Sequence, residues 1–174
     1  NYTLQAIDIR PGYPETRRFL SFLYCLNGEI EKAEQHIMLA YDLDPLSQET
    51  LFFKAYYHYK ALELDIALPL LEDCLKENPF NLPAYILKSY VLIVKNDPEK
   101  LLSFLGAIPE ELLVEGESIG LFCLAYLMGE DRDQQELFWH KLKDLAANSD
   151  AEQAHSYYYL ALVRSGKLDD AMDW

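Results

Sequence analysis

The chain has 174 residues, of which 51% are apolar and 25% are charged, a composition typical of folded globular proteins rather than of disordered chains. Asp and Glu outnumber Lys and Arg by 29 to 15, which gives a net charge of −14. A surface this acidic repels phosphate backbones and anionic lipids, so the composition argues against direct binding of nucleic acids or membranes. It favours solubility or a basic partner.

The first recurring feature along the chain is a set of regularly spaced prolines. They recur every 34 residues, and each follows a small residue five positions earlier: Pro11, Pro45 and Pro79 follow Ala6, Ala40 and Cys74. Other residues share this spacing, namely Ala33 with Ala67, Ser21 with Ala55 and Ser89, and Phe22 with Tyr56 and Tyr90. Several coincident sets at one period indicate an internal repeat.

The repeat unit reads as a pair of helices. In the copy that begins at Pro14, apolar residues at helical spacing are followed by Asn27-Gly28, where glycine supplies a left-handed helix end. A second helix is predicted from Ile30, and Pro45 ends it because proline lacks an N–H and restricts the residue before it. Residues 1–13 resemble the tail of an earlier repeat.

This unit resembles the tetratricopeptide repeat (TPR) family. The first full copy, over 14–47, matches the family motif at Ser21, Tyr24, Gly28, Ala33, Ala40 and Pro45. The second copy, over 48–81, matches at Ala55, Ala67, Cys74 and Pro79, but has Leu62 where the family has glycine.

The later copies depart further from the motif. An irregular repeat over 82–114 keeps Ser89 but carries Leu101 at the alanine position, and another irregular repeat over 115–151 is marked by Gly129. A truncated repeat follows over 152–174. No linker separates the copies, so we expect one array over 1–174. The chain begins without methionine and ends within an amphipathic pattern, so we expect a fragment of a larger TPR-containing protein.

The resemblance implies an all-α fold, a right-handed α-solenoid of stacked antiparallel helix pairs. It also implies a non-enzymatic scaffold that binds a protein or peptide partner on a concave surface. Carried onto this chain, the lining positions of the first helices are Arg18, Phe22, Phe52, Tyr56, Tyr59, Lys60, Ile86, Tyr90 and Tyr126. Aromatic side chains suit a partner surface, since they give large contact area at low entropy cost. The same aromatics could instead be ordinary core between repeats.

Lys54 and Lys88 also share the repeat spacing, at a position where the family usually has leucine. They could present two cations to an acidic ligand. The favoured interpretation is that each buries its aliphatic stem and keeps its ammonium group in water.

No catalytic motif, phosphate-binding loop or metal-ligand spacing is present in the sequence, so we predict neither enzymatic activity nor a cofactor or metal. The three cysteines are far apart and lie within helical segments. They read as buried apolar residues in a reducing compartment, which favours a cytoplasmic location.

Two alternatives remain open. Interrupted arrays of this kind resemble those in bacterial signalling proteins and transcription regulators, where the repeats form a sensing or regulatory segment beside an output domain. A homodimer through an exposed terminal repeat near Trp174 is the other, because terminal repeats normally need a polar cap.

Overall fold

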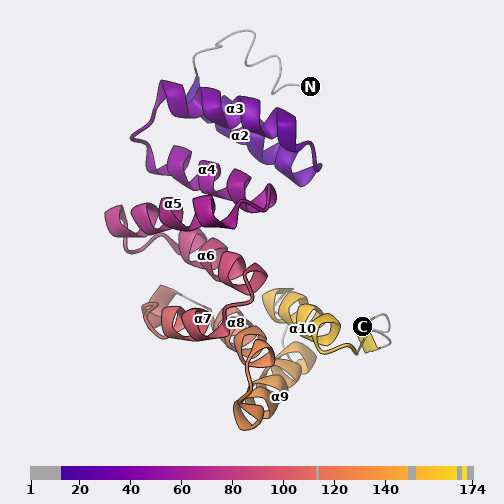
Figure 1. Cartoon of the computed structure of the whole chain (residues 1–174). Helices are drawn as coiled ribbons and strands as arrows, with labels where there is room; N and C mark the ends of the chain where they lie inside the picture. Colours follow the sequence, from indigo (N-terminus) through magenta and orange to yellow (C-terminus); the bar gives the residue numbers. More distant parts are fainter. Residues whose placement is uncertain (1–12, 113, 149–151, 168–169, 172–174) are drawn as a thin grey trace. The chain divides into compact units, whose positions relative to one another are not determined.

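The structure is a computed structural model that describes residues 13–112, 114–148, 152–167 and 170–171. All regular secondary structure in these ranges is helical (Figure 1), which confirms the predicted all-α class. Residues 1–12 of the expected tail of an earlier repeat (1–13) and the terminal Trp174 lie outside the described residues. The chain divides into two compact units, Asn1–Val91 and Leu92–Trp174.

The first unit is built of antiparallel helix pairs. Helix α2 (Pro14–Leu26) packs on α3 (Ile30–Leu43), and α4 (Gln48–Lys60) packs on both α3 and α5 (Leu64–Glu77). Helix α6 (Leu82–Val94) follows, and the boundary between the units falls near its end. The pairing is visible in the order of ribbons from α2 to α5 (Figure 1).

Local sequence signals start these helices. Pro14 occupies the first turn of α2, where its missing N–H costs no hydrogen bond. The Ser47 hydroxyl accepts the backbone N–H of Thr50 at 3.3 Å, and the Asn81 side-chain oxygen accepts that of Ala84 at 3.1 Å. These caps satisfy donors that a helix start would otherwise leave unpaired.

The recurring small residues lie in the core between the helices of the first unit. Ala33, Ala40, Ala67 and Cys74 are all completely buried, and so is Ala55 at the centre of α4. Because these side chains are small, neighbouring helices approach closely, and larger side chains such as Ile37 and Leu71 fill the space beside them. The 34-residue period is therefore the spacing at which small side chains recur in the core between helices.

Left-handed backbone recurs at the ends of α2, α4, α6 and α10 (Glu152–Arg164). Gly28 has φ 75°, Leu62 has φ 61° and Asn96 has φ 55°, and these positions are 34 residues apart. Gly166 has φ 76°. The turn therefore keeps its conformation where leucine replaces the family's glycine, although a leucine there costs about 1–2 kcal/mol.

We expect Leu62→Gly to stabilise the protein by about 0.5–1 kcal/mol. The gain is relief of the left-handed strain, reduced by the larger entropy that glycine has in the unfolded chain. Little packing is lost, because Leu62 is 72% exposed. Urea denaturation measures the change, and Gly28→Leu is the matched control. That variant should lose stability although no atom lies within 4 Å of the added Cβ. A destabilised Leu62→Gly would contradict the strain argument.

The second unit contains α7 (Pro98–Leu105), a short 3₁₀ turn η1 (Glu110–Leu112), α8 (Glu115–Met128), α9 (Arg132–Asn148) and α10 (Glu152–Arg164). Helix α8 packs against α7, α9 and α10. Helix α7 has only 8 residues. Leu101, which stands at the family's alanine position, is fully buried there.

Two glycines on α8 bring α10 unusually close. Gly116 lies against Ala154, and Gly120 lies directly against the buried ring of Tyr157. A Cβ on Gly116 would sit 3.4 Å from the Ala154 backbone nitrogen, an ordinary contact, whereas one on Gly120 would sit 2.5 Å from Tyr157 Cβ. The absence of a side chain at Gly120 therefore sets the position of this crossing.

Candidate partner-binding surface

Five predicted positions of the first unit form a run of half-buried aromatic rings, which we call the aromatic wall. Its members are Phe22 of α2, Phe52, Tyr56 and Tyr59 of α4, and Tyr90 of α6. The ring centroids of Phe22 and Tyr56 are 5.2 Å apart, and those of Tyr56 and Tyr59 are 6.5 Å apart. Such tilted pairs stabilise the wall beyond the area that they bury.

Two tyrosines of the wall, Tyr56 and Tyr59, have pKa values raised above the ordinary value. Burial raises the pKa of Tyr59, and the nearby Tyr90 raises it further. Burial also raises the pKa of Tyr56, with smaller contributions from Cys25 and Tyr59. At neutral pH the wall therefore carries no charge of its own and offers apolar ring faces with hydroxyl groups.

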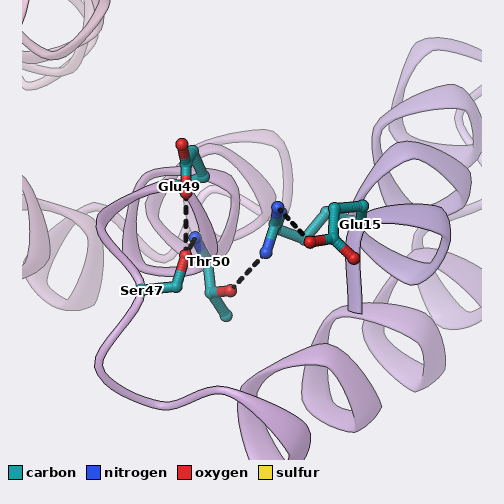
Figure 2. A network of polar contacts seen from close by, with 5 residues as sticks. Glu15, Ser47, Glu49 and Thr50 are labelled. Carbon is teal, nitrogen blue, oxygen red and sulfur yellow. Dashed lines mark hydrogen bonds and ion pairs between the residues drawn. The ribbon is translucent and has the colours of Figure 1, made fainter. Parts of the chain in front are cut away.

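Arg18 was predicted to line the same surface. Its side chain instead makes a contact between two helices. It is only 7% exposed. Its Nη1 donates to the hydroxyl of the fully buried Thr50 at 3.0 Å, and its Nη2 lies 3.9 Å from a Glu15 carboxylate oxygen. Figure 2 shows this network between Glu15 and Thr50. It ties α2 to the first turn of α4, so Arg18 is not an open contact point for a partner.

We expect Thr50→Val to destabilise the protein by about 1–2 kcal/mol, because it leaves the buried Arg18 guanidinium without its nearest acceptor. The double variant Arg18→Met/Thr50→Val should recover most of this loss, since both polar partners are then replaced by apolar groups. A double-mutant cycle by urea denaturation measures the coupling. Additive losses would show that the hydrogen bond contributes nothing specific.

The comparisons with known proteins fit this architecture. No protein-family model matches the chain, and no curated protein matches it. Among solved structures, the chain is similar to yeast Tom70, with a TM-score of 0.67 and 15% identity over 99% of this chain. It is also similar to a structure of a MamA mutant, with a TM-score of 0.59 and 15% identity over 95% of this chain. Both are built of tetratricopeptide repeats.

The chain has the tetratricopeptide-repeat fold. It spans 37% of the length of the Tom70 chain and 94% of that of the MamA chain. At 15% identity, the similarity to these two structures supports a shared fold and nothing further. The predicted resemblance to the family is confirmed at that level.

The other predicted positions are Lys60, Ile86 and Tyr126. Lys60 is half-buried and close enough to Cys25 to affect its pKa, and Ile86 is half-buried on α6. Tyr126 belongs to the second unit, where its ring lies 5.1 Å from Phe138 and 6.4 Å from Phe122. The structure thus gathers the aromatic wall within the first unit and leaves Tyr126 in a separate ring cluster.

Phe53 is a member of the ring cluster that the repeat motif does not pick out. Its centroid lies 5.9 Å from that of Phe22 and 5.6 Å from that of Phe52, both with edge-on geometry. It packs on the core around Ala33 and Ile37. Its place directly after Phe52 was the available sequence signal, but helical periodicity puts adjacent residues on different faces.

The two repeat lysines have specific partners. The Lys54 ammonium lies 3.6 Å from the centroid of the Tyr41 ring, a cation–π contact, and Lys88 donates to Glu72 at 3.0 Å. Lys54 of α4 therefore contacts α3, and Lys88 of α6 contacts α5. The prediction that the ammonium groups point only into water is not what the structure has, because each ammonium group contacts a side chain of a neighbouring helix.

Within the ranges that the structure describes, no group of three His, Cys, Asp or Glu side chains could hold a metal ion. No described helix is long and apolar enough to span a membrane.

Proposed function

We propose that this chain is a protein-interaction scaffold whose first unit binds an extended segment of another protein along the aromatic wall. The observation that carries the proposal is the row of half-buried aromatic rings on α2, α4 and α6. A ring that is neither fully buried nor fully exposed gives a partner apolar area without much side-chain entropy to lose.

The tetratricopeptide-repeat fold supports the same proposal, because stacked helix pairs create extended binding surfaces. The charge of −14 favours a partner with basic residues near the contact. Arg18 is left out of the proposed surface, since its guanidinium is already bonded to Thr50.

Site-specific photo-crosslinking tests the proposal. A benzophenone amino acid replaces Tyr56, Tyr59 or Tyr90 in separate variants, and each is irradiated in lysate and analysed by mass spectrometry. We expect the same protein to be captured from all three positions, through neighbouring segments of its sequence.

Tyr24 is the matched control. It is also a half-buried tyrosine, but it lies two positions after Phe22 on α2 and its ring stacks on His36 of α3 at 5.5 Å. Equal capture from Tyr24, or different proteins from the three wall positions, would overturn the proposal. Thermal melts of each variant confirm that it remains folded.

A further inference from the structure

A hollow of about 480 Å³ opens at the end of the aromatic wall, and we call it the α4–α6 hollow. Its apolar lining comes from Phe52 and Phe53 of α4, from Phe80 in the loop, and from the start of α6. Phe80 is 66% exposed. The full lining is Gln48, Glu49, Phe52, Phe53, Asn78, Phe80, Asn81, Leu82 and Pro83.

One repeat earlier, two of the equivalent positions are joined by a hydrogen bond. A shift of 34 residues takes Phe52 to Arg18 and Ala84 to Thr50, and these two are hydrogen-bonded at 3.0 Å (Figure 2). In the second repeat the same positions carry a phenylalanine and an alanine, which cannot bridge. Phe52 therefore lines the hollow with an apolar ring, whereas Arg18 at the equivalent position is engaged in a polar contact.

The polar groups at the rim are arranged to donate. The Asn78 side-chain oxygen accepts the backbone N–H of Phe80, and the Asn81 side-chain oxygen accepts that of Ala84, both at 3.1 Å. With each side-chain oxygen accepting a backbone N–H, the NH₂ group of each asparagine is the donor that can bind a ligand, and peptide carbonyls are suitable acceptors. The exposed Glu49 carboxylate adds a negative charge at the same rim.

We propose that the α4–α6 hollow takes a bulky apolar side chain from a basic segment of a partner protein. This rests on the proposed function and adds the chemistry of the ligand. Phe52 joins the hollow to the aromatic wall, so a single extended segment can occupy both. The apolar lining selects the side chain, the amide groups hold the peptide backbone, and Glu49 with the net charge of −14 selects basic flanks.

Titration with short synthetic peptides, followed by backbone amide NMR shifts of the full chain, tests this inference. The probe is acetyl-Lys-Lys-Leu-Phe-Lys-Lys-amide. Its comparison peptides carry Glu in place of every Lys, or Ala in place of Leu and Phe. We expect only the first to bind at about millimolar concentration, with the largest shifts at Phe80, Asn81 and Leu82.

The chain offers a matched pair of variants. Phe80→Ser should weaken binding by about tenfold, whereas Leu46→Ser, at the equivalent position one repeat earlier and 89% exposed, should leave it unchanged. Pro83→Lys, on an exposed site of the lining, should also weaken binding through charge repulsion without removing any packed side chain.

The outcomes separate this inference from the proposed function. Shifts confined to Tyr56, Tyr59 and Tyr90 would refute binding at the α4–α6 hollow but support binding at the aromatic wall. Absence of binding to the unmodified chain, or equal binding by the Phe80→Ser variant, would overturn the hollow as well. Shifts of the same resonances on concentrating the protein without peptide would identify a second copy of the chain as the occupant and refute the basic segment.

Discussion

Gly120→Ala is expected to destabilise the protein by about 2 kcal/mol, although the same change in an open helix stabilises by about 1 kcal/mol. The added Cβ would sit 2.5 Å from both Cβ and Cδ2 of Tyr157 and closer still to its Cγ. These atoms are the root of a buried side chain, so they cannot swing aside as a flexible end could. Relief therefore requires α8 and α10 to separate, which loses contacts along the crossing. Urea denaturation measures the change.

Gly116→Ala is the matched control on the same helix. Its Cβ would meet Ala154 at 3.4 Å or more, an ordinary van der Waals distance. We expect a neutral effect or a gain of up to about 1 kcal/mol. If Gly120→Ala proved as stable as the parent chain, the close approach of α10 to α8 would be refuted.

The second large effect is a loss of stability at alkaline pH. Burial raises the pKa of Cys25 and Cys74 from 9.0 to about 11, with the Asp73 carboxylate adding to the effect at Cys74, and it raises the pKa of Cys123 to about 12. The folded state therefore keeps these thiols protonated at a pH where the unfolded chain releases the protons. The free energy of unfolding should be unaffected below about pH 8 and should fall above about pH 9, by up to about 1.4 kcal/mol per pH unit for each thiol.

Denaturation at several pH values tests this, with Cys123→Ala as the comparison. The variant should lose less stability than the parent chain between about pH 9 and pH 10. This window also limits the contribution of Tyr57, whose pKa burial raises from 10.0 to about 12. Parallel pH profiles for the two proteins would show that Cys123 ionises equally in both states.

The native thiols should also react slowly with an aromatic disulfide reagent, because the thiolate is the reactive form.

The repeat sequence by itself determined the helical pairing. The spacing of Ala33, Ala67 and the three prolines follows the period at which helices must approach closely and then end. Those rules are local or nearly so, and a single sequence expresses them directly. The left-handed turn at Leu62 also follows from the period, although its residue type argues against it.

The candidate surface was predictable in part. Periodicity places Phe22, Tyr56 and Tyr90 on matching faces of successive helices, and the structure joins them with their neighbours into one wall. Periodicity does not show that Arg18 on that face is hydrogen-bonded to Thr50, which lies 32 residues away in the sequence. Such a pairing depends on the exact approach of two helices.

Only the tertiary structure decided the close crossing at Gly120, the bridge at Arg18 and the α4–α6 hollow. The spacing of Gly116 and Gly120 on α8 was a signal of close packing, but it names no partner helix. The hollow is lined by Phe52, whereas the equivalent Arg18 of the preceding repeat is hydrogen-bonded to Thr50. A repeat motif fixes the helices through local spacing, whereas the surface of each copy depends on which side chains meet across the packing contacts, and the motif leaves those side chains free to vary.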